Sequence, residues 1–367
     1  MKVLFIAPLP PPVTGQSVAV QALLDQLTAD GHVVVPINMS KNTFRQGVSS
    51  LSRVRDVLAM AWRTWRAGRD FDCVYLTTAE SVAGNLKDML LLAALGSLRA
   101  KTWLHLHGGA GMRNLLADRK SWIGRLNSYF LRRVAGVIVL GARLAPIFDG
   151  YVRQDLVRAV KNFAADELFI SEGAMAEKWA DTQVLRVLFL SNLLPGKGHE
   201  ELLRAIRSMP PALANRFSFD FAGGFESAAD QERFLAGIKD LPCVRYHGVV
   251  QGEAKQALLR KAHVFCLPTF YPYEGQPISI LEAYASGCVV LTTDHSGIFD
   301  VFAPGENGWE VLPHSPDSIV AALETLAGDH GGAACVARRN RAEADLKYRR
   351  RAHLNDLYAA MGWSDSK

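Results

Sequence analysis

A repeated alternation of apolar runs and helical patterns limits most strongly what this chain can fold into. The first run, residues 3–7, ends in a proline-rich loop, a helical pattern covers about 18–27, and a second apolar run follows at 32–35. A strand, a helix and a strand in that order form the unit of a parallel sheet. The same alternation begins again at about residue 187. The sequence therefore predicts an α/β protein with two doubly wound domains.

The length of 367 residues agrees with two domains of roughly 150 residues each. We expect the first domain over 1–165 and the second over 180–345. A polar stretch rich in alanine and glutamate, at about 164–182, is the expected linker. Residues 346–367 contain a last helical pattern, at about 346–361.

The composition excludes several classes of protein. With 49% hydrophobic and 21% charged residues, the chain is neither disordered nor a coiled coil. Its longest strongly apolar runs, such as residues 89–98, fall short of the roughly 18 residues that a transmembrane helix needs. The five scattered cysteines form no C-x-x-C pair, which indicates free thiols in a reducing cytoplasm rather than disulfides or a zinc site.

Positive charge is concentrated in the first half of the chain. Residues 1–180 hold 22 Lys and Arg against 14 Asp and Glu, a balance of +8, whereas residues 181–367 hold 19 and 22, a balance of −3. Two segments, 51–69 and 119–133, combine arginines with aromatic residues. Basic amphipathic helices of this kind favour an anionic membrane surface. A surface helix that packs its apolar stripe on the sheet would show the same pattern.

Chemistry is expected in the loops that follow strands, because ligands of open parallel sheets bind beyond the carboxyl ends of the strands. The richest of these loops reads Glu274-Gly-Gln-Pro-Ile-Ser-Ile-Leu-Glu282. Pro277 suits a helix start, where the amides of Ile278 and Ser279 would face an anion. Glu282, one turn on, could accept two hydrogen bonds from a vicinal diol such as a ribose. Two glutamates at this spacing also occur in ordinary loops and helices.

Two further loops contain candidate ligand contacts. Lys197 stands between two glycines at a strand-to-helix turn, which suits a phosphate contact. This turn is not a P-loop, because Gly198 follows the lysine where serine or threonine is required. His107 opens a glycine-rich loop that lacks the third glycine of a dinucleotide-binding motif.

No metal site is expected. His105 shares a strand face with His107, but no third ligand accompanies them. Asp70 and Asp72 form a short acidic pair, yet they precede a strand and so belong to the wrong end of the sheet.

Together these segments resemble one family. EGQPISILEAYASGCVVLTTDHSG, with its E-x(7)-E spacing, is similar to the signature of the family 4 retaining glycosyltransferases, which have the GT-B fold. SNLLPGKG resembles the phosphate-binding turn of that family, PPPVTGQS its amino-terminal glycine loop, LHLHGG its donor-sugar histidine loop and ENGWEV a late turn. The resemblance covers nearly the whole chain, and the ordered series is far more specific than any one segment.

The resemblance implies a fold and a set of roles. The fold would be two Rossmann-like domains that face each other across a cleft, with the last helix crossing back to the first domain. Glu274 would hold hydroxyls of the donor sugar near the reacting carbon, and His107 would contact the same sugar. The nucleotide diphosphate and ribose would be bound by Gly15, Gln16, Asn192, Lys197, Gly198, Ile278, Ser279 and Glu282.

Two positions depart from the family pattern. Asn192 stands where the family often has an arginine, and an amide cannot supply a guanidinium fork. Either another cation replaces that arginine, or the diphosphate is held less strongly. Asp300 stands where a glutamate is more usual, which is a milder change.

We therefore expect a cytoplasmic retaining glycosyltransferase, peripheral on the inner face of the cell membrane, in bacterial polysaccharide or glycolipid synthesis. It would move a sugar from a UDP- or GDP-sugar to a glycan or a polyprenyl-pyrophosphate-linked acceptor. No metal or other cofactor is expected, because cationic side chains and a helix start would neutralise the leaving diphosphate. The alternatives are a sugar-nucleotide epimerase or hydrolase of the same fold, and a nucleic-acid-binding protein, for which no recognised motif is present.

Overall fold

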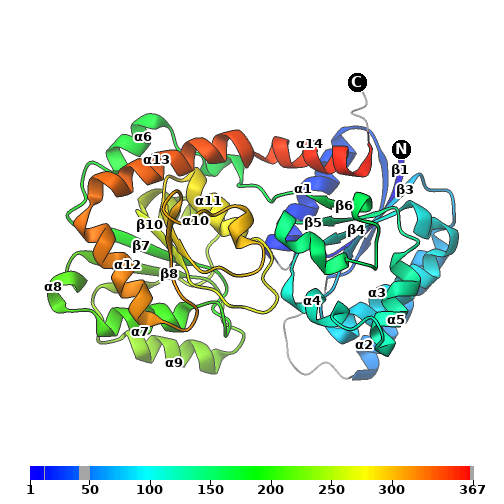
Figure 1. The fold of residues 1–367 in the computed structure, drawn as a ribbon, viewed down its shortest axis with the longest axis horizontal. Coiled ribbons are helices and arrows are strands. Elements are labelled where there is room, and N and C mark those ends of the chain that lie inside the picture. Colours follow the sequence, from blue (N-terminus) through cyan, green and yellow to red (C-terminus); the bar gives the residue numbers. More distant parts are fainter. Residues whose placement is uncertain (12, 41–49, 364–367) are drawn as a thin grey trace. The chain divides into compact units, whose positions relative to one another are not determined.

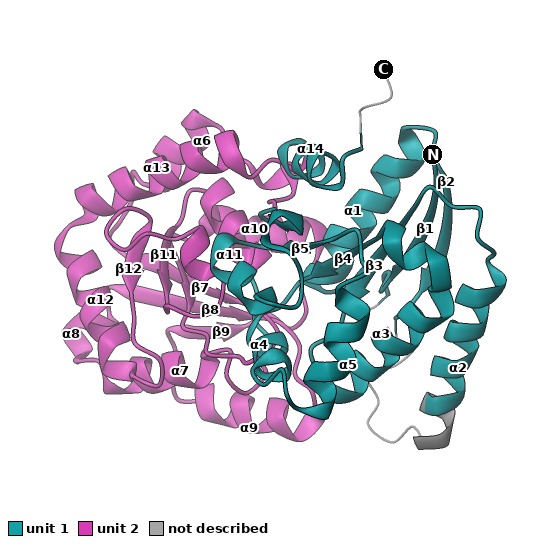
Figure 2. Cartoon of the chain, turned by 45° about the vertical axis from the view of Figure 1, so that its right-hand side comes forward, with its two compact units in different colours: residues 1–162, 273–276, 351–367 teal, residues 163–272, 277–350 magenta. Residues whose placement is uncertain are grey.

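The computed structural model describes residues 1–11, 13–40 and 50–363, with the side chains of 50–53 left aside. The chain forms two parallel six-stranded sheets, each covered by helices (Figure 1). Contacts divide it into two compact units (Figure 2). The first unit comprises 1–162, 273–276 and 351–367, and the second comprises 163–272 and 277–350.

The first unit has the strand order β2-β1-β3-β4-β5-β6. Its inner strands are mostly buried and apolar, as is usual for all-parallel sheets with both faces covered by helices, whereas the edge strand β2 has a single buried residue. The strands are β1 (Lys2–Ala7), β2 (Val33–Asn38), β3 (Cys73–Thr78), β4 (Thr102–Leu106), β5 (Gly136–Val139) and β6 (Val157–Ala159). The helices between them are α1 (Gly15–Ala29), α2 (Ser50–Arg66), α3 (Val82–Leu95), α4 (Ala110–Leu116) and α5 (Trp122–Leu131).

Alternate residues of β1 face opposite sides of this sheet, which gives the first unit two cores. Leu4 and Ile6 lie in one core, and Val3 and Phe5 lie in the other. The second of these cores is closed by α1 and by the last helix, α14 (Arg350–Met361), whose Tyr358 hydroxyl donates to Asp30 at 2.6 Å. The last helix thus packs on the first unit.

The last helix begins at Arg350, four residues later than the expected start at 346. Residues 346 and 347 instead end α13 (His330–Lys347). Tyr348 separates the two helices, because its side chain is fully buried and its carbonyl accepts a hydrogen bond from the amide of Ala164 at 2.8 Å.

The second unit has the strand order β12-β11-β10-β7-β8-β9 around a single core. The strands are β7 (Leu185–Leu190), β8 (Phe217–Ala222), β9 (Val244–Tyr246), β10 (Val264–Leu267), β11 (Val289–Thr292) and β12 (Gly308–Glu310). Besides α13, the helices are α6 (Glu172–Lys178), α7 (His199–Ser208), α8 (Pro211–Ala214), α9 (Ala228–Ile238), α10 (Gly252–Lys261), α11 (Ile278–Ala285) and α12 (Pro316–Gly328).

The expected linker at about 164–182 was wrong, because this stretch is part of the second unit. Leu168, Met175 and Trp179 are buried in its core. Lys178 of α6 donates to the carbonyls of Leu259 and Ser286, at 3.2 and 2.6 Å. The polar composition of the segment concealed a few large apolar residues, spaced so that one side of the stretch is buried.

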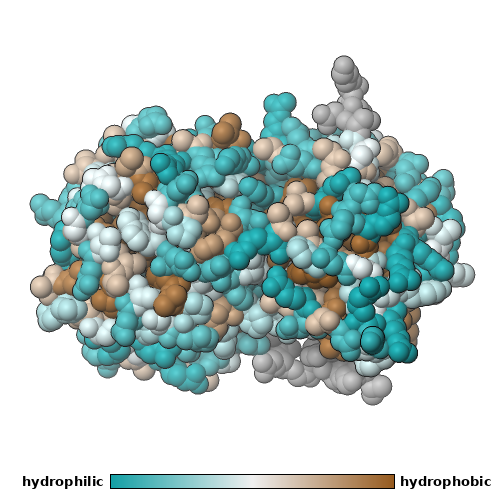
Figure 3. All heavy atoms as spheres, in the orientation of Figure 1, coloured by the Kyte–Doolittle hydropathy of each residue, from teal (hydrophilic) through white to brown (hydrophobic). Residues whose placement is uncertain are grey.

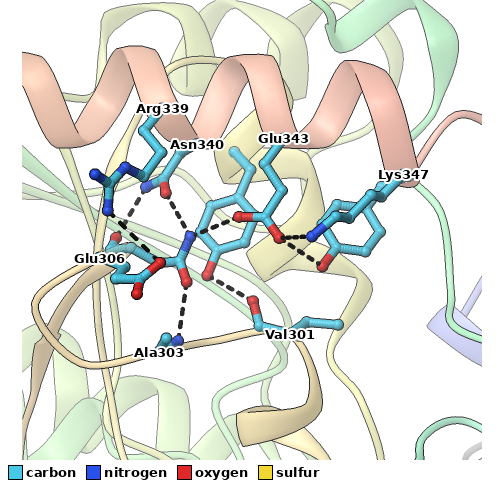
Figure 4. Close-up of polar contacts among 10 residues, drawn as sticks. Val301, Ala303, Glu306, Arg339, Asn340, Glu343 and Lys347 are labelled. Atoms are coloured by element: carbon cyan, nitrogen blue, oxygen red, sulfur yellow. Dashed lines mark hydrogen bonds and ion pairs between the residues drawn. The ribbon is translucent and has the colours of Figure 1, made fainter.

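A buried polar network ties the late turn of the ENGWEV segment to α13 (Figure 4). Asn340 is fully buried, donates to the carbonyls of Cys288 and Asn307 at 2.9 and 2.8 Å, and accepts from the Asn307 side chain at 2.9 Å. The Asn307 amide also donates to Glu343, whose other oxygen accepts from Lys347. Each amide thus finds partners inside the unit, as buried polar groups require.

The surface drawn in Figure 3 is mostly hydrophilic, with hydrophobic side chains in small groups. In the part of the chain that the structure describes, no helix is long and apolar enough to cross a membrane.

Candidate active site

The glycine-rich loop after β4 places His107 at the carboxyl edge of the first sheet. The ring of His107 lies against that of His105, with the ring centroids 3.9 Å apart. Its Nε2 is buried without a hydrogen-bond partner. Burial, with a smaller contribution from His353, lowers the pKa of His107 to about 3. The imidazole is therefore neutral at physiological pH and can offer a hydrogen bond but not a positive charge.

Glu274 is buried and belongs to the first unit, although the chain on either side of Tyr273–Gln276 belongs to the second. Gln276 fixes this segment: its Nε2 donates to the carbonyl of Leu140 at 2.8 Å, and its Oε1 accepts from the amide of Asn162 at 2.7 Å. The Asn162 side chain also donates to the carbonyl of Gln276, at 2.8 Å.

The Glu274 segment packs directly on the His107 loop. A Cβ added to Gly275 would lie 2.2 Å from the carbonyl oxygen of His107, so only glycine allows this approach. The structure thus brings together two predicted sugar contacts, His107 and Glu274, within the first unit.

Glu80 is a residue of this site that the sequence reading missed. It follows β3 by two residues and accepts hydrogen bonds from the amides of Gly109 and Met112, at 2.8 and 3.2 Å. Burial, and to a smaller extent the charge of Glu274, raise the pKa of Glu80 to about 7, against the lowering effect of the backbone amides. Its position at the carboxyl end of a strand was the signal that could have identified it.

Lys197 occupies a tight turn after β7 in the second unit. Gly196 and Gly198 have φ values of +88° and +91°, which strongly favour glycine. A Cβ on Gly198 would lie 2.4 Å from the carbonyl oxygen of Pro268, so the turn rests on the loop after β10. The Lys197 ammonium lies 4.6 Å from the centroid of the Tyr271 ring.

Helix α11 follows β10, the neighbour of β7 in the sheet. Pro277 stands at the N-cap, and Ile280 donates the first hydrogen bond of the turn to its carbonyl, at 3.2 Å. The amides of Ile278 and Ser279 precede that bond, so they have no acceptor within the helix. The Lys197 turn and this helix start therefore follow adjacent strands.

Glu282, one turn into α11, is buried and paired. Its Oε1 accepts from the ammonium of Lys255 on α10 at 2.5 Å. Lys255 was not among the predicted site residues, because a lysine on an amphipathic helix carries no sequence signal for such a contact.

The remaining predicted residues follow strands of the two sheets, so each lies at the carboxyl edge of its own sheet. Gly15 and Gln16 begin α1, where Thr14 and Ser17 cap the helix through mutual hydrogen bonds of 2.8 and 3.1 Å. Pro12, in the same loop, lies outside the described residues. Asn192 follows β7 and is exposed.

Among the described residues, no group of three or more His, Cys, Asp or Glu side chains is arranged to hold a metal ion. Asp70 is almost fully exposed and pairs with Lys2 at 3.1 Å. The Asp72 carboxylate accepts from the backbone amide of Lys2 at 2.8 Å.

Residues 185–329 match the family model of glycosyl transferases group 1. The matched segment lies in the second unit, apart from 273–276, and contains the Lys197 turn and both glutamates of the E-x(7)-E motif. The chain spans 36% and 42% of the first curated relatives that it matches.

Two of the relatives are named as glycosyl- or mannosyltransferases of a stated product or acceptor. The amylovoran biosynthesis glycosyltransferase of Erwinia amylovora is 25% identical over 45% of this chain and 42% of its own length. The phosphatidyl-myo-inositol mannosyltransferase of Mycolicibacterium smegmatis is 26% identical over 84% of this chain and 73% of its own.

Among solved structures, HepE of Anabaena in complex with UDP-glucose is similar over 99% of each chain, with a TM-score of 0.73 and 16% identity. At this identity the likeness shows the fold alone. The fold is GT-B, as predicted.

Proposed function

We propose that this protein is a family 4 glycosyltransferase that moves a sugar from a UDP- or GDP-sugar with retention of anomeric configuration. One observation carries the proposal: a glycine-flanked lysine and a helix start with free amides follow the adjacent strands β7 and β10. A cation and converging backbone amides are the usual partners of a diphosphate. HepE, which shares the fold, binds UDP and UDP-glucose, which supports a nucleotide-sugar donor here.

In this proposal the second unit binds the nucleotide. Lys197 and the amides of Ile278 and Ser279 neutralise the diphosphate as it leaves, with no metal or other cofactor. Glu282 accepts from the ribose diol, while Lys255 holds its other oxygen in place. Gly198 lets the backbone approach the diphosphate, and Asn192 contributes only an amide.

The first unit would hold the donor sugar. The buried, unpaired Nε2 of His107 offers a hydrogen bond to a sugar hydroxyl, and Glu274 accepts from others near the reacting carbon. An oxygen of the leaving diphosphate would take the proton of the incoming acceptor hydroxyl. A hydrolase or epimerase of the same fold is the alternative; turnover of donor at full rate without any acceptor would favour it.

Nucleotide binding is the direct test of the proposal. Titration calorimetry with UDP and with GDP should show that one of them binds, and Lys197→Ala should weaken that binding about 10- to 100-fold, the effect of one charged hydrogen bond. Lys239→Ala, at an exposed position on the second unit, is the matched control and should not change affinity. Binding of neither nucleotide would contradict the proposed donor, and normal affinity after Lys197→Ala would contradict the role of that lysine.

We further propose that the first unit docks on an anionic membrane at its cytoplasmic face, where a polyprenyl-pyrophosphate-linked acceptor would be found. Four apolar side chains of α2, spaced four, four and three residues apart, form one stripe that is more than half exposed: Val54, Leu58, Trp62 and Trp65. Arg55, Arg63 and Arg66 accompany it on the same helix. An exposed apolar stripe among cations suits an anionic bilayer surface. Arg53, in the same predicted segment, has a side chain outside the described residues.

The second basic segment is less suited to docking than the sequence suggested. Helix α5 covers only Trp122–Leu131 of the segment 119–133. The Arg119 guanidinium lies 5.4 Å from the centroid of the Tyr151 ring, and Arg133 lies 4.6 Å from that of Tyr129. Part of this charge is therefore directed at the protein's own rings.

Vesicle co-sedimentation tests the docking. The wild type should bind phosphatidylglycerol vesicles at low salt and dissociate at high salt. Serine at Trp62, Trp65, Arg63 and Arg66 should weaken binding at least about tenfold, because each basic residue contributes about 1 kcal/mol near such a surface. Serine at Arg119, Lys120, Arg125, Arg132 and Arg133 should have a smaller effect. If the wild type binds no vesicles, or if neither variant changes its binding, these two segments are not a docking surface.

A further inference from the structure

Glu80 fills the centre of the glycine-rich loop that follows β4. A Cβ on Gly108 would lie 1.3 Å from Oε1 of Glu80, and a Cβ on Gly111 would lie 2.7 Å from the Glu80 Cβ. The glycines of this loop, which resembled a weak nucleotide-binding motif in the sequence, therefore make room for a carboxyl side chain. The other oxygen of Glu80 binds the amides at the start of α4.

Glu80 also lies near the Glu274 segment, because the charge of Glu274 acts on it. The position that a Gly111 Cβ would occupy lies 2.9 Å from the ring of Tyr273, directly before Glu274. Glu80 therefore lies near both parts of the predicted sugar site in the first unit: the loop that begins with His107, and the segment that contains Glu274.

Titratable groups on three neighbouring segments lie near Glu80. Glu274 faces it from the segment 273–276, and the neutral His107 belongs to the loop that it binds. On α3, Asp88 pairs with Lys87 and accepts from the amide of Ala79, the residue before Glu80. Burial and Glu274 both disfavour the charged form of Glu80, whereas the amides of Met112, Gly109 and Gly111 favour it.

We propose that Glu80 is a positioning residue of the donor-sugar site, which holds the 107–112 loop in its binding shape by accepting hydrogen bonds from the amides of Gly109 and Met112. The role of Glu80 in the sugar site rests on the proposed function, whereas its role in holding the loop does not. The ionised carboxylate makes the stronger hydrogen bonds to the loop amides. Lowering the pH through about 7 should therefore loosen the loop and reduce donor turnover, since the pKa of Glu80 lies there.

Hydrogen–deuterium exchange tests the loop without any ligand. In Glu80→Ala, the amides of Gly109 and Met112 should exchange about tenfold faster or more, because each loses its acceptor. Glu80→Gln retains one acceptor oxygen, so the exchange rates of these amides should increase less. This variant can be measured even if Glu80→Ala does not fold. Asp70→Asn removes an exposed carboxylate before the same strand and should change neither amide. Unchanged exchange in both Glu80 variants would overturn the inference, whether or not the sugar donor is correct.

Stability gives a second measurement on the same variants. The pKa of Glu80 is raised from an ordinary 4.5 to about 7, so its contribution to stability is full below the lower value and is lost as the pH rises through the higher one. Glu80→Gln removes this loss. The melting temperature of Glu80→Gln relative to the wild type should therefore rise between pH 5 and pH 8, and a constant difference would contradict a buried, titrating Glu80.

Turnover of UDP-glucose, followed as UDP release, connects Glu80 to the sugar. Glu80→Ala should lower kcat about tenfold or more and leave the affinity for UDP within twofold, because UDP lacks the sugar. The fall in kcat below pH 7 should disappear in Glu80→Gln. If exchange is altered but kcat and its pH profile are not, Glu80 supports the loop alone and the sugar-site role is wrong. If the wild type binds GDP instead of UDP, the same measurements apply with a GDP-sugar; binding of neither nucleotide would contradict the proposed donor, and the exchange result would then decide the loop alone.

Discussion

Replacing Glu274 by alanine is expected to lower kcat about 10²–10³-fold, the scale for losing one preorganised contact in the transition state. The Glu274 carboxylate is buried, and Gln276 fixes its segment through hydrogen bonds with Leu140 and Asn162. The carboxylate is therefore already in place before the reaction begins. Steady-state kinetics with the donor identified by nucleotide binding would measure the effect. The exposed Glu324→Ala, on α12, is the control and should retain the wild-type kcat.

The comparison with Glu282 separates two kinds of contribution. Glu282→Ala should mainly raise the donor KM, because a ribose contact is the same in the ground state and the transition state. It also leaves Lys255 without its carboxylate partner. A fall in kcat for Glu282→Ala together with a raised KM for Glu274→Ala would show that the two roles are exchanged.

Replacing Asn340 by leucine should destabilise the second unit by about 3 kcal/mol. Asn340 makes three buried hydrogen bonds, with Cys288 and Asn307, and leucine would leave two carbonyls and an amide short of a partner. The midpoint of chemical denaturation, followed by tryptophan fluorescence, would report the change.

Arg339→Leu is a matched control on the same helix, one residue away (Figure 4). Arg339 makes a solvent-exposed ion pair with Glu306 at 3.6 Å, and such pairs contribute little to stability. Its loss should cost less than about 0.5 kcal/mol. Equal effects of the two substitutions would show that the buried amide network is not a major source of stability.

The fold class could be predicted because its signal is local. Apolar runs such as the one at β1 alternate with helical stripes, and this order alone indicates parallel sheets. The loops of His107 and Lys197 were found because they follow strands. The prediction for the segment 164–182 is wrong, because its average composition hides the apolar residues that pack in the core.

The contacts that complete the site could not be predicted from one sequence. Gln276 binds Asn162, 114 residues away in the chain, and Lys255 binds Glu282 from another helix. Neither Asn162 nor Lys255 has a residue type or a spacing that sets it apart from ordinary surface positions. Glu80 differs, because its place after β3 could have indicated it without the structure.

Hybrid proteins made by exchanging whole halves of such chains would meet a difficulty at Tyr273–Gln276. A transferred block of 163–350 includes these four residues. The residue that the donor chain has at position 276 would then face the recipient's Asn162 and Leu140. Exchanging 163–272 and 277–350 while retaining the recipient's own 273–276 keeps that hydrogen-bonded segment native. Before residue 350, three junctions therefore suit recombination better than one. They lie between 162 and 163, between 272 and 273, and between 276 and 277.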